Sequence, residues 1–238
     1  MLKTFIRRQL ERVLHARGYR LVADNTFDWP SRDAEFQEIF ALQARFGGWE
    51  RGGPKVQRMY MIRNLIMSLG GKDGDWAECG TFKGSTALVM AEYARRYNLL
   101  REGRKIHIFD SFEGLSAPTA EDHGTRMADR DFAADESVVR ANLAPYDCFE
   151  FHRCWIPERF SDVADREFAF VHIDVDLYEP VRDSLGFFLP LMVPGGIVAL
   201  DDYGCAETPG ALKATDEIAA KFGRHVVRLP YGQAFVLA

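Results

Sequence analysis

Aspartate residues follow two apolar stretches of the sequence. Residues 168–180, FAFVHIDVDLYEP, begin as an apolar strand and then place Asp174 and Asp176 two positions apart. A second apolar run, GGIVALDDYG, ends in Asp201 and Asp202. Carboxylates at the ends of buried strands lose hydration and need partners, and crowded carboxylates repel one another unless a cation or proton joins them. Oxygen donors without neighbouring His or Cys favour a hard ion, Mg²⁺ first and Ca²⁺ second.

Asp174 and Asp176 need not have the same role. Alternation along a strand places both on the same side of the pleat. Asp176 lies beyond the strand end and has three possible roles: orienting the loop, reaching a cofactor, or capping the following helix. Capping is also the alternative role for Asp174.

A glycine-containing loop follows an earlier short strand. In AECGTFKGSTAL, Gly80 and Gly84 permit a tight turn and close approach of a ligand. Thr81, Ser85 and the start of the next helix supply donors for an anionic group. The loop is not the dinucleotide fingerprint, because Phe82 stands where its second glycine would be. The alternative is an ordinary strand-to-helix turn.

Asp110 ends the next strand, in IHIFDSFEGL. A carboxylate at this point of a nucleotide-binding fold accepts hydrogen bonds from ribose hydroxyls, although aspartate is also common in turns. The loop and Asp110 together favour a nucleoside ligand, and the absence of the second glycine favours one without phosphates.

Strands alternating with helices must position these residues. This alternation predicts crossover connections and an α/β fold with a doubly wound, mostly parallel, seven-stranded sheet. The short turn at residues 231–232 makes the last strand antiparallel to its neighbour. Ligands of such sheets bind outside the carboxyl ends of the strands, where the acidic residues fall. The predicted strands are residues 75–79, 105–110, 148–153, 168–174, 195–202, 225–230 and 233–238.

The first 72 residues are predicted to be helical and to form an N-terminal extension to a domain of residues 73–238. Two apolar stripes have helical spacing: Phe36, Ile39 and Phe40, then Met59, Ile62, Ile66 and Leu69.

Composition narrows the class of protein. The net charge of -5 and the lack of a basic patch argue against nucleic-acid binding. No apolar run is long enough to span a membrane, and the charged N-terminus has no signal-peptide core. The four cysteines fit no zinc template, so we expect free thiols in a reducing cytoplasm.

Four stretches resemble the macrocin O-methyltransferase family: ECGTFKGSTA, FDSFEGL, FVHIDVDLYEPVRDSL and VPGGIVALDDYG. The resemblance covers residues 35 to about 205. It implies a class I, Rossmann-like methyltransferase that uses S-adenosylmethionine and a divalent metal to methylate hydroxyls, notably on sugars of natural products. The chain departs from the family at Cys154, where the family often has glycine before the tryptophan.

The resemblance also implies roles for individual residues. It places the metal, Mg²⁺ or another hard divalent cation, on Asp174, Asp201 and Asp202, and Asp174 is the candidate base. A cation on the acceptor oxygen would favour a vicinal diol or catechol, and residues 1–72 would choose this small-molecule acceptor. The expected cofactor-binding residues are Glu78, Gly80, Thr81, Ser85, Asp110, Ser111, Phe112 and Trp155.

Two other functions remain open on the sequence alone. One is a nicotinamide-dependent oxidoreductase of the same fold class, and the other is a non-catalytic nucleoside-binding protein. Among the histidines, His107 and His172 are expected to be packed in strands rather than to act as bases. His123 lies on a long polar insert that is either a solvated loop or a lid.

The helical first third also predicts self-association. An amphipathic segment runs from Met1 to Arg17, and we expect part of this region to pack on a second copy of the chain, giving a homo-oligomer. Light scattering at micromolar concentration should then give a mass well above 27.1 kDa. A single species of 27.1 kDa would instead mean that the apolar stripes cover the protein's own sheet.

Overall fold

The computed structural model describes residue 13 and residues 28–46 and 54–238. The chain divides into two compact units, Met1–Asp33 and Ala34–Ala238. The first contains the short helix α2 (Trp29–Arg32), and the second contains everything discussed below. The predicted amphipathic segment at residues 1–17 lies outside the described residues except for Val13, so self-association stays a prediction.

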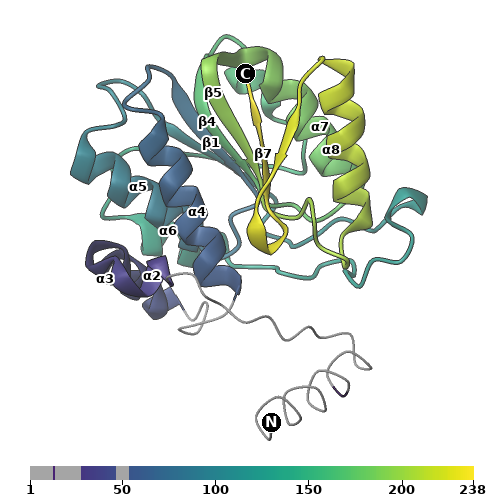
Figure 1. Cartoon of the computed structure of the whole chain (residues 1–238), viewed down its shortest axis with the longest axis horizontal. Helices are drawn as coiled ribbons and strands as arrows, with labels where there is room; N and C mark the ends of the chain where they lie inside the picture. The colour runs from purple at the N-terminus through teal and green to yellow at the C-terminus, as the bar shows by residue number, and fades with distance from the viewer. Residues whose placement is uncertain (1–12, 14–27, 47–53) are drawn as a thin grey trace, which may run out of the picture. The chain divides into compact units, whose positions relative to one another are not determined.

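Seven strands form one sheet in the order β3-β2-β1-β4-β5-β7-β6 (Figure 1). The first five in this order pair in parallel, whereas β7 is antiparallel to both β5 and β6. The predicted α/β class, seven strands and antiparallel last strand are therefore confirmed. The strands are β1 (Asp75–Cys79), β2 (Ile106–Asp110), β3 (Phe149–Arg153), β4 (Phe168–Ile173), β5 (Met192–Leu200), β6 (Val226–Arg228) and β7 (Ala234–Leu237).

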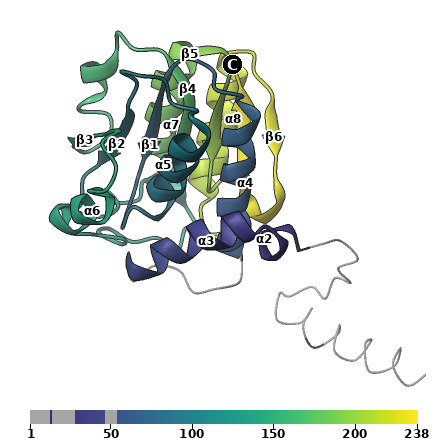
Figure 2. The same ribbon diagram turned by 90° about the vertical axis from the view of Figure 1, so that its left-hand side faces the viewer.

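Helices cover both faces of this sheet, as a doubly wound fold requires (Figures 1 and 2). One face carries α3 (Ala34–Leu42), α4 (Pro54–Ser68), α5 (Ser85–Tyr97) and α6 (Glu136–Leu143), and the other carries α7 (Tyr178–Phe188) and α8 (Pro209–Lys221). Short 3₁₀ turns connect them: η1 (Gln43–Phe46), η2 (Ala120–Asp122), η3 (Phe160–Val163), η4 (Leu189–Leu191) and η5 (Pro230–Gly232).

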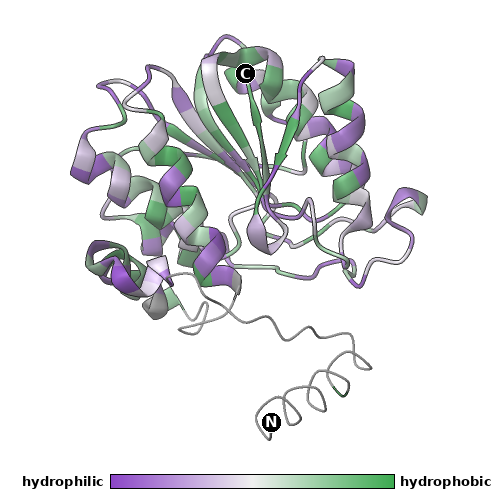
Figure 3. Cartoon of the chain, in the orientation of Figure 1, coloured by the Kyte–Doolittle hydropathy of each residue, from purple (hydrophilic) through white to green (hydrophobic). Residues whose placement is uncertain are grey.

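The core lies between the sheet and these two helical layers. Hydrophobic residues dominate the strands, while the helices alternate between hydrophobic and hydrophilic positions (Figure 3). All seven residues of the two predicted apolar stripes are buried, at 5% exposure or less. Gly70 and Gly71 follow α4 with φ of 61° and 73°, a left-handed conformation that ends a helix. No described helix is long and apolar enough to cross a membrane.

Glu92 links α5 to the loop after α6 and generates a prediction about acid stability. Its buried carboxylate accepts bonds from Tyr146 (2.6 Å), Arg95 (2.8 Å) and Arg96 (3.0 Å). Burial alone would raise the pKa of Glu92, but these bonds outweigh it and lower the pKa. The charged form therefore contributes stability above the unfolded pKa of about 4.3 and loses it as pH falls through the depressed folded pKa.

We expect Glu92→Gln to lower the free energy of unfolding at pH 7 by about 1.5–3 kcal/mol, the range for hydrogen bonds to charged groups. The gap between variant and wild type should narrow below about pH 4. Urea unfolding across pH measures it, with the exposed Glu102→Gln as control. A gap that stays constant down to pH 3 would mean that packing rather than charge is responsible.

Candidate active site

A cavity of about 980 Å³ opens at the carboxyl ends of β1, β2, β4 and β5. This is the edge of the sheet where the acidic residues were predicted to gather. The strand order reverses between β1 and β4, the crevice where open α/β sheets bind ligands. The cavity is lined by residues 78–86 in part, by Asp110 and Ser111, by parts of residues 114–132 and 155–157, by residues 174–183 and 201–208 in part, and by Lys55 and Arg58.

Gly80 begins the loop after β1, and its backbone packs against the residues that follow β4. It has φ of 79°, and a Cβ there would lie 2.0 Å from the carbonyl oxygen of Asp174. In addition, Asp174 N donates to Cys79 O at 2.9 Å. Glycine is therefore required here for close contact between two protein backbones, and not only for approach of a ligand.

Two carboxylates hold the loop in place. Glu78 accepts a bond from Thr81 Oγ1 at 2.7 Å. Asp110 accepts three backbone N–H bonds, from Thr81 (2.7 Å), Phe82 (3.2 Å) and Phe112 (2.7 Å). Burial nevertheless raises the pKa of Asp110 above its ordinary value. Asp110 thus ties the loops after β1 and β2 together beneath the cavity.

Seven of the eight predicted cofactor-binding residues line the cavity, and Phe112 does not. Phe112 is buried in the core between the sheet and α5, with φ of 59°. Its backbone N–H serves the site by bonding to Asp110. Trp155 lines the cavity, and the Arg130 guanidinium lies 5.1 Å from its ring centroid.

The aspartates after β4 and β5 form two overlapping clusters. Oxygens of Asp174, Asp176 and Asp202 lie within 4.8 Å of one another, and Asp174 and Asp201 group in the same way with His172. Burial and the neighbouring carboxylates Asp176 and Asp174 hold the pKa of Asp202 well above its usual range. Burial and Asp174 likewise raise the pKa of Asp176 to about 7. These two carboxylates are therefore crowded without enough compensating positive charge.

Asp201 is in the opposite situation. Its Oδ2 lies 2.7 Å from Arg58 and 3.4 Å from Lys55, and its Oδ1 accepts a bond from Gln233 at 2.7 Å. Burial would raise the pKa of Asp201, but Lys55, His172 and Arg58 hold it well below its usual range. Lys55 Nζ also lies 3.3 Å from Asp174, so this ammonium sits between the carboxylates of both strands.

Sequence reasoning did not identify Lys55, Arg58 or Gln233 as site residues. Lys55 and Arg58 are three positions apart near the start of α4, and this spacing puts them on one helix face. That pair was the available signal, but nothing local indicated which carboxylates they would meet. Arg58 also donates to Tyr231 O at 2.8 Å and contacts Cys205 Sγ.

His172 and His123 have different surroundings. His172 is buried beneath the cavity, with Nδ1 3.1 Å from Glu78 and Nε2 3.8 Å from Asp201. Burial works against its protonation, but Asp201 and Glu78 raise the pKa of His172 to about 10. His123 is exposed and does not line the cavity. The insert that carries it is anchored through Asp122, which accepts a bond from Tyr178 N at 2.8 Å.

Comparisons with known proteins point to one family. A family model described as macrocin-O-methyltransferase (TylF) matches residues 55–223. The 8-demethyl-8-(2,3-dimethoxy-alpha-L-rhamnosyl)-tetracenomycin-C 4'-O-methyltransferase of Streptomyces olivaceus is 30% identical over 157 residues, or 60% of this chain and 58% of that protein. The demethyldecarbamoylnovobiocin O-methyltransferase of Streptomyces niveus is 29% identical over 181 residues, or 70% and 67% of the two chains.

Solved structures agree on the fold. The O-methyltransferase NovP matches with a TM-score of 0.65 and 25% identity, covering 83% of this chain and 87% of that one. The calicheamicin methyltransferase CalS11 matches with a TM-score of 0.66 and 17% identity, covering 91% and 99%. At 17% identity, the similarity to CalS11 is evidence for the Rossmann-like fold only.

The contact between Gly80 and Asp174 generates a prediction. Gly80→Ala adds a methyl group against a backbone carbonyl and forces a left-handed conformation, so it should cost about 1–2 kcal/mol for the conformation and about 1–3 kcal/mol or more for overpacking. Gly103→Ala is the matched control, since Gly103 has φ of 80° and nothing within 4 Å of the added Cβ. Denaturant unfolding should show the larger loss for Gly80→Ala. Equal losses would mean that the loop shifts away from β4 without strain.

Proposed function

Because the chain belongs to the macrocin-O-methyltransferase family, we propose that it transfers a methyl group from S-adenosylmethionine to a hydroxyl of a sugar or natural product, with the help of a divalent cation. One observation carries the proposal: a single cavity contains both the glycine loop with Asp110 and the aspartates after β4 and β5. At about 980 Å³, it is at the upper end of the size of small-molecule sites, which leaves room for a cofactor beside an acceptor.

The cofactor half of the cavity is the part bounded by β1 and β2. The carboxylate of Asp110 accepts three backbone bonds, and a carboxylate has about four acceptor positions, so one remains for a ribose hydroxyl. Gly80, Thr81 and Ser85 also line the cavity, and Trp155 offers it an aromatic surface. When bound, S-adenosylmethionine would supply a methyl group already activated by its sulfonium.

The metal half of the cavity lies over β4 and β5. Its donor atoms are carboxylate oxygens, which suit Mg²⁺, and the raised pKa values of Asp176 and Asp202 indicate a charge imbalance that a cation would relieve. We propose Asp174 and Asp202 as ligands, with the third position taken by Asp201, as the family resemblance implies, or by Asp176, as the carboxylate spacing implies. A bound Mg²⁺ would lower the pKa of an acceptor hydroxyl and fix its position.

Asp174 is the proposed base. Its side chain is 23% exposed and lines the cavity, whereas His172 is buried and does not line it. Lys55 is a poor candidate because, although burial opposes its charge, Asp174, Asp201 and Asp202 raise its pKa above the ordinary value and keep it protonated. Lys55 and Arg58 instead balance the charge of the carboxylates.

The acceptor would enter beside the cation. We propose a vicinal diol as the acceptor, since two adjacent hydroxyls match a cation held from one side. The apolar side chains of Leu115, Met127 and Phe132 on the insert line the cavity and offer contacts to a larger natural product. Lys55 and Arg58 belong to the first 72 residues, which supports a role of that region in choosing the acceptor.

The four free thiols are consistent with our further proposal of a cytoplasmic location.

Metal removal tests the proposal. Methyl transfer from labelled S-adenosylmethionine to a panel of rhamnosides with adjacent hydroxyls should stop in EDTA and resume with Mg²⁺. Asp202→Asn should lower turnover by more than the 10–100-fold loss typical of groups that merely orient a metal ligand. It should still bind S-adenosylmethionine in calorimetry, because the proposed cofactor contacts lie mainly after β1 and β2.

Two variants test the third ligand. Asp176→Asn and Asp201→Asn each remove one charge, and only the variant that loses a ligand should weaken Mg²⁺ binding strongly. Because Asp201→Asn also breaks ion pairs with Arg58 and Lys55, thermal unfolding of each variant is measured beside its Mg²⁺ affinity. Full activity of metal-free protein would contradict the metal proposal alone. Failure to bind S-adenosylmethionine would contradict the proposed function as a whole.

A further inference from the structure

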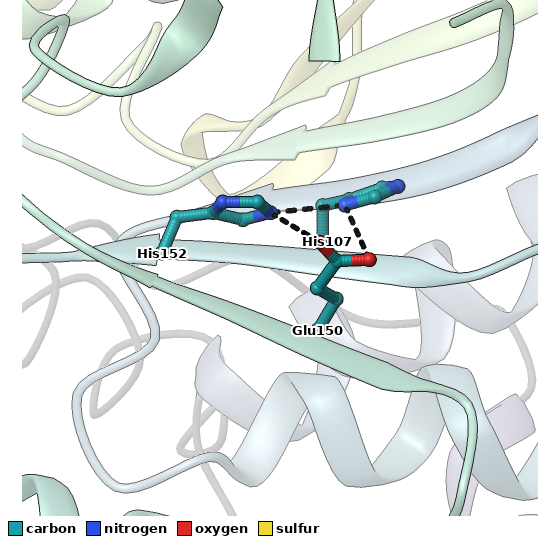
Figure 4. Close-up of side chains that lie close together, drawn as sticks. All are labelled: His107, Glu150 and His152. Carbon is teal, nitrogen blue, oxygen red and sulfur yellow. Dashed lines mark hydrogen bonds and ion pairs between the residues drawn. The ribbon is translucent and has the colours of Figure 1, made fainter. Parts of the chain in front are cut away.

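Two histidines and a glutamate converge on the face of the sheet covered by α7, outside the cavity. His107 lies on β2 and Glu150 and His152 lie on β3, with His107 opposite Glu150 in the register. His107 Nδ1 and His152 Nε2 are 3.0 Å apart. The two oxygens of Glu150 lie 3.8 Å from His152 Nε2 and 3.9 Å from His107 Nδ1. Figure 4 shows the three side chains directed toward one another.

The outer nitrogen of each histidine faces a further carboxylate. His107 Nε2 lies 3.3 Å from Asp75, and His152 Nδ1 lies 3.5 Å from Asp162. This is the arrangement in which metal-bound histidines are usually found, each donating its second N–H to a carboxylate that fixes the ring. Neither Asp75 nor Asp162 lines the catalytic cavity.

A hydrogen bond between two neutral rings does not satisfy all of these contacts. If both rings are neutral and His107 donates from Nε2 to Asp75, His107 must accept at Nδ1, so His152 donates from Nε2. His152 Nδ1 then carries no proton and faces the carboxylate of Asp162, which also cannot donate. That nitrogen is buried and has no hydrogen-bond partner. Two arrangements let both outer nitrogens keep their protons: a second proton on His107, or a cation between the inner nitrogens. Titration with a metal distinguishes them.

Aromatic neighbours fix the orientation of both imidazole rings. The ring of Phe109 stacks on His152 with centroids 4.5 Å apart, and Phe168 packs edge-on against His107. Burial and the nearby His107 lower the pKa of His152, which favours the neutral form that binds metals. The Glu150 side chain is 51% exposed, so this edge of the group is accessible to solvent.

We propose that His107, His152 and Glu150 bind a Zn²⁺ ion, with water in a fourth position. Two imidazoles and one carboxylate are a common ligand set for this ion. Tetrahedral bonds of about 2.0–2.1 Å put two nitrogens roughly 3.3 Å apart, within a few tenths of an ångström of the distance here. Strand β3 pairs only with β2 in the sheet, so an ion shared between them would fasten the edge strand that leads to Trp155.

The experiment uses full-length, metal-stripped protein in excess Mg²⁺, which under the proposed function would occupy the acidic cluster. Titration with Zn²⁺ should show one saturable site in calorimetry and raise the midpoint of thermal unfolding. Co²⁺ in place of Zn²⁺ should give visible absorption without the near-ultraviolet band of a thiolate ligand, which separates this site from the cysteines.

Two exposed positions supply variants that should still fold. Glu150→Gln removes a ligand and Asp162→Asn removes the carboxylate behind His152, and each should weaken Zn²⁺ binding by about 10–100-fold. Asp202→Asn is the control, since it alters the acidic cluster and should leave Zn²⁺ affinity unchanged. Absence of a saturable Zn²⁺ site, or wild-type affinity in both Glu150→Gln and Asp162→Asn, would overturn the proposal and leave His107 and His152 as a hydrogen-bonded pair.

Discussion

The placement of carboxylates at the ends of β4 and β5 is the constraint on which the site depends. Asp201 and Asp202 are adjacent in sequence and both buried, yet their charges are balanced differently. Asp201 is compensated by Arg58 and Lys55 from α4 and by Gln233 from the C-terminal region. Elements from both ends of the domain must therefore dock at this edge of the sheet, because an uncompensated buried charge is strongly destabilising.

Two backbones also meet at this edge of the sheet. Gly80 fits against the carbonyl of Asp174, and Asp110 binds the loops after β1 and β2 together through three N–H groups. The crevice between β1 and β4 thus positions the glycine loop directly beside the first aspartate of the cluster. Under the proposed function, a cofactor over the loop and an acceptor over the aspartates would therefore lie next to each other.

Local pattern in the sequence was sufficient to predict the alternating elements, the antiparallel last strand and the edge where acidic residues gather, since periodicity and strand ends are local properties. Contacts between distant segments were not predictable in this way. Lys55 lies 119 positions from Asp174 in the chain, and the sequence around Lys55 does not indicate which carboxylate it will pair with. Phe112 was expected to touch the cofactor, but its left-handed φ turns the residue so that its backbone serves Asp110 while its ring joins the core.

The difference in charge compensation between Asp201 and Asp202 affects how the domain can fold. Ion pairs with Arg58 and Lys55 make Asp201 part of the fold itself, so its charge helps to hold α4 in place. Asp202 receives a backbone bond from Asp176 at 3.2 Å, and burial beside Asp176 and Asp174 raises its pKa. The strain of crowded charge is thereby confined to residues that face the cavity. A fold that keeps Asp201 compensated and Asp202 poorly compensated can form without a cation, and under the proposed function the crowded carboxylates would then attract one.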